Sequence, residues 1–246
     1  MKQKKQMVLG VLAMAMGVWI SCQTVPHSTA PAADAMIQSY LTLSTSSVSD
    51  AIDQVLGQRG YMSHTIRPLF PVKMCGYAVT VLAQPTDEKV PPSMALDLID
   101  TTAPGHVLVI VMDGPDGADV AAFGGIMGTG AQARQFAGAV LDGGCRDALQ
   151  LEEMGFPVFT KSVVPTNSVG RYKNVAKNTP VVCGGIPVEP GDVVLGDGDG
   201  VVVVPKSHAA AVLRLALELE AKEAQTMEDV KALRSIRKAS EKNQRI

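Results

Sequence analysis

The stretch "HVLVIVM" at residues 106–112 is the feature that most restricts how this chain can fold. Six apolar residues follow a single histidine without polar alternation, and such a run is typical of a strand that is covered on both faces of a sheet. Sheets of this kind are mostly parallel, and helices link and cover their strands. The chain is therefore expected to be an α/β protein.

The neighbouring segments repeat the pattern of helix and strand. The expected elements are a helix within 39–56, a strand within 73–83, a helix within 93–103, a strand through Leu141, a helix within 146–155 and a strand within 156–163. Short Val-rich strands between Pro-Gly and Asp-Gly turns predict an antiparallel meander at 179–205.

The first 35 residues have the composition of an export signal followed by a linker. A basic start precedes an apolar stretch at 7–20, which is short for a membrane span and is typical of a signal peptide. We expect a signal peptide at 1–22, a Pro/Ser/Ala-rich linker at 23–35 and an exported protein. Two alternatives stay open: lipidation of Cys22, which would give a membrane-anchored lipoprotein, or ordinary cleavage near Ala33, which would release a periplasmic protein.

Charge and cysteine content argue against several other classes. The formal net charge is −2 and no basic block lies inside the body of the chain, so no nucleic-acid partner is expected. Besides Cys22, the three cysteines fit no zinc spacing, and a chain of 246 residues needs no disulfide to support its core. We expect Cys75, Cys145 and Cys183 to be buried free thiols.

The rest of the sequence divides into a domain and a tail. With 46% hydrophobic residues in the chain, residues 36–206 can form a single α/β core. From about Ser207 no glycine or proline interrupts the pattern, which predicts one long helix. We assign residues 207–246 to a C-terminal helical segment.

Two polar features follow neighbouring strands of the predicted sheet. "GGIMGTG", residues 124–130, is expected to be a glycine loop whose backbone N–H groups attract an anion, although its spacing fits no nucleotide motif. The glycine pair at 143–144 is expected to turn the chain and present Arg146 and Asp147 at the same sheet edge. A carboxylate there suits Mg²⁺ and a guanidinium suits an oxyanion. The alternative is that Asp147 is an N-cap residue, paired to its neighbour, at the start of the following helix.

The stretch "FGGIMGTGAQARQFAGAVLDGGCRD" places twenty residues between Gly125 and the Arg-Asp pair. Together with "STSSVSDAID" and "PGDVVLGDGDGVVVVP", it resembles the RraA-like family over about residues 41–205. That family includes the regulator of ribonuclease E activity A and the class II pyruvate aldolases that act on 4-hydroxy-4-methyl-2-oxoglutarate and 4-carboxy-4-hydroxy-2-oxoadipate. The resemblance implies a swivelling β/β/α domain, here with a long C-terminal helix, and a homotrimer or hexamer with sites between subunits.

The resemblance also implies a site and a reaction. Asp147 would hold Mg²⁺ or Mn²⁺, and Arg146 would bind a small 2-oxo acid. Backbone N–H groups would bind the carboxylate of that acid; these belong to Gly124, Gly125, Ile126 and Met127. Stabilisation of a pyruvate enolate is common to aldol cleavage and to oxaloacetate decarboxylation.

Two positions depart from the family pattern. Family members usually carry an acidic residue where this chain has Gly125, and another where it has Gln150. An acid from the final helix of a neighbouring subunit would complete the site, with Glu220 and Glu223 as candidates. The expected function is a divalent-metal-dependent lyase that acts on a 2-oxo acid by aldol cleavage, oxaloacetate decarboxylation or both. The alternative is an exported, non-catalytic RraA-like trimeric binding protein, whereas no cofactor loop supports a methyltransferase.

Overall fold

The computed structural model describes residues 34–244. The expected signal peptide at 1–22, its Cys22 and nearly all of the 23–35 linker lie outside the described residues. Within 34–244, no helix is both long enough and apolar enough to cross a membrane.

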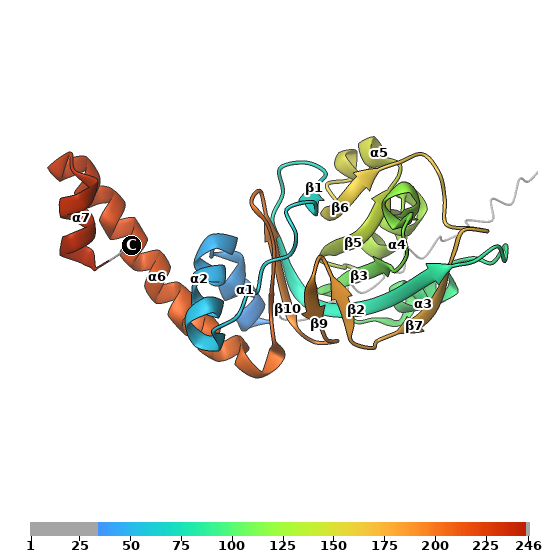
Figure 1. Cartoon of the computed structure of the whole chain (residues 1–246), viewed down its shortest axis with the longest axis horizontal. Coiled ribbons are helices and arrows are strands. Elements are labelled where there is room, and N and C mark those ends of the chain that lie inside the picture. Colours follow the sequence, from blue (N-terminus) through green and yellow to red (C-terminus); the bar gives the residue numbers. More distant parts are fainter. Residues whose placement is uncertain (1–33, 245–246) are drawn as a thin grey trace, which may run out of the picture. The chain divides into compact units, whose positions relative to one another are not determined.

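Nine of the strands in this part of the chain form one mixed sheet (Figure 1). The central parallel strands lie in the order β6-β5-β3-β2; they are β2 (Met74–Pro85), β3 (His106–Met112), β5 (Gly138–Cys145) and β6 (Val158–Val163). The others are β1 (Arg67–Pro68), β4 (Ala121–Phe123), β7 (Tyr172–Lys177), β10 (Val193–Asp197) and β11 (Gly200–Val204). Strand β3 lies between two neighbours, and its six apolar residues are all buried. The α/β prediction is therefore confirmed.

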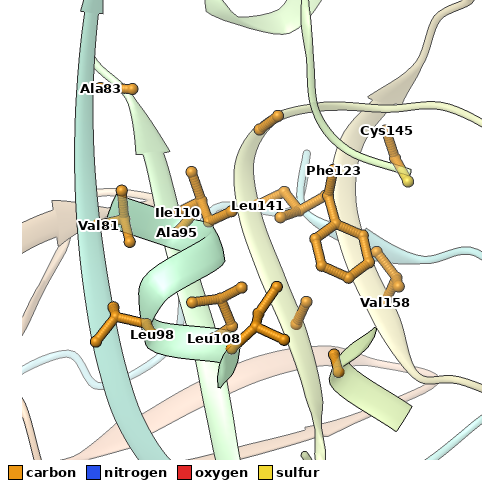
Figure 2. Close-up of a cluster of buried hydrophobic side chains, with 14 of the residues drawn as sticks. Val81, Ala83, Ala95, Leu98, Leu108, Ile110, Phe123, Leu141, Cys145 and Val158 are labelled. Atoms are coloured by element: carbon orange, nitrogen blue, oxygen red, sulfur yellow. The ribbon is translucent and has the colours of Figure 1, made fainter. Parts of the chain in front are cut away.

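Helices cover one face of the parallel strands. They are α3 (Ser93–Thr101), α4 (Gly125–Ala133) and α5 (Ala148–Glu153). Their apolar side chains, among them Leu98 of α3 and Leu151 of α5, share one buried cluster with Leu108 of β3 and Leu141 of β5. Figure 2 shows part of this cluster. Helix and strand periodicity predicted α3, α5 and the strands, but not α4, because each of these segments buries an apolar face against the others.

Other parts of the sheet pack against a second group of helices and a hairpin. Helices α1 (Ala35–Leu41), α2 (Thr45–Leu56) and α6 (Ala209–Leu233) share an apolar cluster with β10 and β11, and α2 lies beside α6 (Figure 1). The hairpin of β8 (Val181–Cys183) and β9 (Ile186–Val188) packs against a third cluster, which includes Phe159. The predicted meander is thus two separate hairpins, because only β10 and β11 join the main sheet.

The C-terminal segment differs from the predicted single helix. Helix α6 ends at Leu233, and a second helix, α7, spans Ile236–Asn243. Arg234 adopts a left-handed conformation with φ 49°, and the Ser235 side chain accepts a hydrogen bond from the Lys238 N–H at 3.3 Å. Serine is a favourable N-cap, so a new helix begins here without glycine or proline.

The packing between β10 and β6 makes a stability prediction. A Cβ atom on Gly196 would lie 2.6 Å from the ring of Phe159, which is fully buried and cannot swing away. We expect Gly196→Ala to destabilise the protein by about 1–3 kcal/mol, as overpacking of a core does, in a urea unfolding experiment. Gly198→Ala is the matched control, because a Cβ atom there meets nothing within 4 Å. Equal stability of the two variants would contradict this packing.

Candidate active site

The glycine-rich stretch at 124–130 is mostly helix, so the prediction of a loop was wrong. Helix α4 begins at Gly125, and Gly124 is its N-cap residue. A Cβ atom on Gly128 would lie 2.3 Å from Cδ2 of Leu151. The glycine therefore lets α4 lie close to α5, and the N-terminus of α4 still provides the backbone N–H groups that the loop was expected to offer.

The glycine pair at 143–144 does not turn the chain, which corrects a second prediction. Strand β5 continues through both glycines to Cys145. A Cβ atom on Gly143 would lie 2.5 Å from Cγ of Met112, and one on Gly144 would lie 2.8 Å from the Val120 carbonyl oxygen. Neighbouring elements come so close to the strand here that only glycine fits. The chain turns after the pair.

The turn is made by Asp147, which adopts a left-handed conformation with φ 58° and ψ 35°. Aspartate is one of the few residues besides glycine that adopt this conformation readily. Asp147 occupies the N-cap position of α5, but its side chain makes no capping hydrogen bond to that helix. Its Oδ2 atom instead accepts a hydrogen bond from the Gly125 N–H at 2.9 Å. Asp147 is thus an N-cap residue paired with its neighbour Arg146, as the alternative expected, but its side chain binds the start of α4 and does not cap α5.

Arg146 and Asp147 stay together at the start of α4. The Nε atom of Arg146 lies 3.6 Å from Oδ2 of Asp147, and the side chains are 37% and 42% exposed. A Cβ atom on Gly124 would lie 2.8 Å from both Cγ of Arg146 and Oδ2 of Asp147. The absence of a side chain at 124 thus lets the pair rest on the backbone where α4 begins.

The donor set fits a hard divalent cation held by one carboxylate. The second oxygen of Asp147, Oδ1, makes no hydrogen bond or ion pair to any residue of the described chain. Within 34–244, no group of three or more histidine, cysteine or acidic side chains is placed to hold a metal. A cation at this position would have Asp147 as its protein ligand, and water or substrate would fill the other positions, as Mg²⁺ commonly accepts.

A hollow of about 220 Å³ opens beside Arg146. Of the predicted site residues, Gly124, Ile126, Met127 and Arg146 line it, whereas Gly125 and Asp147 do not. The first turn of a helix has no internal acceptors for its N–H groups, and that of Gly125 is already bound to Asp147. The N–H groups of Ile126 and Met127 therefore remain as the anion donors of this helix start.

The sequence did not indicate the other residues that line this hollow. Leu96 of α3 and the loop residues Asn167, Ser168 and Val169 also line it. The loop has neither glycine spacing nor a charged pair that could have marked it in advance. It reaches the site because β6, which precedes it, lies next to β5 in the sheet.

The two departures from the family pattern touch each other. A Cβ atom on Gly125 would lie 2.1 Å from Oε1 of Gln150. The carboxamide of Gln150 therefore fills the space that a side chain at 125 would need. The glycine at 125 thus leaves the room that the Gln150 side chain occupies. The site has no acidic side chain at either position.

Comparison with known proteins agrees with this architecture. The profile of the RraA-like family, described as Aldolase/RraA, matches residues 45–203. The chain belongs to the RraA-like family.

Individual relatives of this RraA-like protein extend the match to most of the chain. A Halalkalibacterium halodurans protein provisionally named 4-hydroxy-4-methyl-2-oxoglutarate aldolase is 31% identical over 205 residues, which are 81% of this chain and 92% of that protein. An uncharacterised Pseudomonas syringae pv. tomato protein matches with a TM-score of 0.77 and 31% identity over 89% of this chain and 99% of its own. RraAS2 of Streptomyces coelicolor, described as an unusual member of the RNase ES inhibitor RraA family, has a TM-score of 0.71 and 27% identity, covering 81% of this chain and 98% of its own.

The predicted neighbour-subunit acids lie on α6, away from the Arg146 hollow of the same RraA-like chain. The Glu220 carboxylate accepts hydrogen bonds from the N–H and hydroxyl of Ser44 at 3.4 and 3.1 Å. Desolvation raises the pKa of Glu220, but hydrogen bonds from Ser47 and Ser44 outweigh it and leave the pKa lowered. Glu223 borders a different hollow, beside Asp50. Neither acid lines the Arg146 hollow of its own chain.

The cysteine next to Arg146 is not a nucleophile in this RraA-like protein. Cys75, Cys145 and Cys183 are buried free thiols, as predicted. Burial raises the pKa of Cys145 to about 12, and the charge of Asp147 acts in the same direction. The thiol therefore stays protonated at neutral pH, and covalent chemistry through a thiolate is not available here.

Proposed function

We propose that this RraA-like protein is a divalent-metal-dependent lyase that acts on a 2-oxo acid through an enolate of pyruvate. The arrangement of Asp147 supports this most strongly. One of its oxygens is bound to the Gly125 N–H at 2.9 Å, and Arg146 lies beside it. The other oxygen is available to Mg²⁺ or Mn²⁺.

Each protein group has its own role in the proposed reaction. Arg146 makes charge-assisted hydrogen bonds to the acid. The N–H groups of Ile126 and Met127, at the positive end of α4, bind the carboxylate and orient it. The Gly125 N–H fixes the orientation of Asp147. A bound Mg²⁺ or Mn²⁺ supplies positive charge that stabilises the negative charge developing on the C2 oxygen.

The missing acid at position 125 favours one of the two reactions. Aldol cleavage needs a base to take the proton from the C4 hydroxyl. Decarboxylation of oxaloacetate needs no such base, because the departing CO₂ leaves its electron pair on C3, which then takes a proton from water. We therefore expect measurable oxaloacetate decarboxylation and weak aldol cleavage.

The test is the rate of oxaloacetate decarboxylation with Mg²⁺ or Mn²⁺, compared with the same metal without protein. We expect a protein-dependent rate that chelation of the metal removes and that Arg146→Ala lowers. A wild-type protein that neither binds pyruvate nor exceeds the rate of the metal alone would favour the alternative of an exported, non-catalytic trimeric binding protein.

We also propose export and assembly. The charged start and short apolar stretch of the sequence support export, and family membership supports a homotrimer or hexamer with a neighbour's Glu220 or Glu223 near the site. Mass spectrometry of protein from its native host should show a mature chain that begins at or after Cys22, and a lipid adduct on Cys22 would identify a membrane tether. An intact N-terminus would contradict export. A monomer in light scattering would contradict the proposed assembly.

A further inference from the structure

A second and larger hollow, of about 650 Å³, lies on the other face of the sheet. Asp142 of β5 and Lys161 of β6 line it. Side chains alternate between the two faces of a strand, and Leu141, which precedes Asp142, belongs to the cluster under α5. Among residues 34–244, this hollow shares no lining residue with the one beside Arg146. Its volume is within the roughly 300–1,000 Å³ of common ligand pockets.

The walls of this hollow are held by contacts within one chain. They are formed by α2, by the segment that follows it and by the turns that join β8 to β9 and β10 to β11. An ion pair between Lys161 and Asp142 joins β6 to β5. The Asp142 carboxylate also accepts a hydrogen bond from the Gly184 N–H, in the first of these turns, at 2.6 Å. Tyr61 forms a β-bridge with Val202 of β11.

Both donors and acceptors in the lining have capacity for a ligand. The Lys161 ammonium group has three N–H donors and the Arg59 guanidinium has five. Within the described chain, Asp142 pairs with the first, and the Tyr61 carbonyl oxygen accepts one hydrogen bond from the second at 2.7 Å. The Asp199 carboxylate makes no hydrogen bond or ion pair to any residue within 34–244.

The balance of charge in the lining favours a neutral ligand. Arg59 and Lys161 contribute two positive charges, and Asp142 and Asp199 contribute two negative charges. An anion would be repelled by Asp199, and a cation would be repelled by Arg59 and Lys161. A molecule with several hydroxyl groups can donate to the carboxylate and accept from the cations at the same time. The neutral ring of His64, which also lines the hollow, can donate or accept one further hydrogen bond.

The lining also offers apolar surface. The side chains of Met62, Val201 and Val202 border the hollow and are otherwise buried. The ring of Tyr61 is 49% exposed, and a tyrosine presents both an apolar ring and a polar hydroxyl. The C–H groups of a polyhydroxylated ring can therefore contact apolar atoms while its hydroxyl groups reach the charged side chains.

We propose that this hollow binds a neutral monosaccharide. The hydroxyl groups of the sugar donate to Asp199 and accept from Lys161 and Arg59. Binding is reversible and non-covalent, and it takes place apart from Arg146 and Asp147. The inference therefore goes beyond the proposed lyase reaction and does not depend on it.

The test is saturation-transfer NMR of the full chain with D-glucose, D-galactose and D-mannose, followed by titration of each sugar that gives a signal. We expect at least one of the three to bind. The amino sugar and the uronic acid that correspond to that sugar carry a positive and a negative charge on the same ring. Both should bind more weakly than the neutral form, because each meets a like charge in the hollow.

Asp199→Ala should raise the Kd of the sugar by at least about tenfold, because it removes a charged hydrogen-bond acceptor. The fold should survive, since Asp199 is exposed and its carboxylate supports no other described residue. Asp87→Ala is the matched control, because Asp87 is also exposed and does not line the hollow. It should bind as the wild type does.

A second pair of variants tests the position of the ligand. Thr65 is exposed and lines the hollow, so Thr65→Trp should obstruct the space and abolish sugar binding. Thr65→Ser keeps the hydroxyl that lies 3.0 Å from the Ser63 hydroxyl, and it should bind normally. Thermal unfolding and light scattering check that folding and assembly are equal in all four variants.

The results that would overturn the inference are distinct. Absence of binding by all three sugars would do so, and so would a charged form that binds at least as tightly as the neutral one. An equal Kd in Asp199→Ala and Asp87→Ala would exclude the proposed contact with the carboxylate. Full binding by Thr65→Trp would place the sugar elsewhere on the protein. None of these results bears on 2-oxo acid binding, which has its own test.

Discussion

Replacing Asp147 with alanine should weaken Mg²⁺ or Mn²⁺ binding by more than about 100-fold while the protein stays folded. Loss of a residue that only orients a metal ligand costs about 10–100-fold in affinity, and Asp147 is the proposed ligand itself. The change also removes the hydrogen bond to the Gly125 N–H, which costs about 1 kcal/mol as for a lost helix cap. Alanine at φ 58° costs roughly 1–2 kcal/mol more.

Calorimetric titration of metal in the presence of pyruvate measures this effect, and thermal unfolding without metal shows whether the fold survives. Asp147→Asn is the matched control, because asparagine also adopts the left-handed conformation and can accept from the Gly125 N–H. It should unfold close to the wild type yet lose metal affinity. Unchanged affinity in Asp147→Ala would remove the metal from this position.

Placing an acid at position 125 should make aldol cleavage faster. General-base contributions amount to about 10²–10⁴-fold, so Gly125→Asp should raise the rate of aldol cleavage within that range if α4 is placed as described. The new Cβ atom would lie 2.1 Å from Oε1 of Gln150. That atom is at the end of a flexible side chain, so Gln150 can rotate away. The positive end of α4 favours the added charge.

Release of pyruvate from 4-hydroxy-2-oxopentanoate is the measurement. The double variant Gly125→Asp with Gln150→Ala removes the steric conflict and should cleave at least as fast as the single variant. Gln150→Ala alone opens the same space without supplying a base, and it should stay slow. A double variant no faster than Gln150→Ala would show that position 125 does not face the reacting hydroxyl.

The sequence predicted the central strands and the Arg-Asp pair for different reasons. A strand such as β3 is buried on both faces, so its composition alone indicates its environment. Arg146 and Asp147 were found because two unlike polar residues follow a buried strand at the edge where such sheets bind ligands. Both features can be recognised from a short stretch of sequence, and the structure contains both the buried strand and the adjacent Arg-Asp pair.

Glycine was interpreted less well. Gly128, Gly143 and Gly144 were assigned to a loop and a turn, yet they lie in a helix and a strand. Glycine is needed at these positions because Leu151, Met112 and Val120 lie so close that a side chain would not fit. These three residues are distant in sequence from the glycines that they contact. A glycine in a turn and a glycine under a close contact look the same in one sequence, so only the tertiary structure separates them.

The edges of the fold were also hard to predict. Strand β7 is short, partly exposed and rich in polar residues, so it has little periodic signal. Helix α6 ends where Arg234 adopts a left-handed conformation. Arginine is not a typical helix-breaking residue, so the sequence does not mark this end. The loop at 167–169 reaches the hollow because β6, which precedes it, lies next to β5 in the sheet. No local sequence pattern indicates this strand order.

The neighbours of Asp147 also bear on the order in which ligands bind. Its carboxylate forms an ion pair with the Arg146 guanidinium at 3.6 Å and a hydrogen bond with the positive end of α4. These two positive groups oppose a lone divalent cation, whereas both attract an anionic acid. Cation and acid should therefore bind synergistically, each raising the affinity for the other by the same factor. A cell that supplies the metal alone would leave most sites empty, and arrival of the acid would recruit the metal.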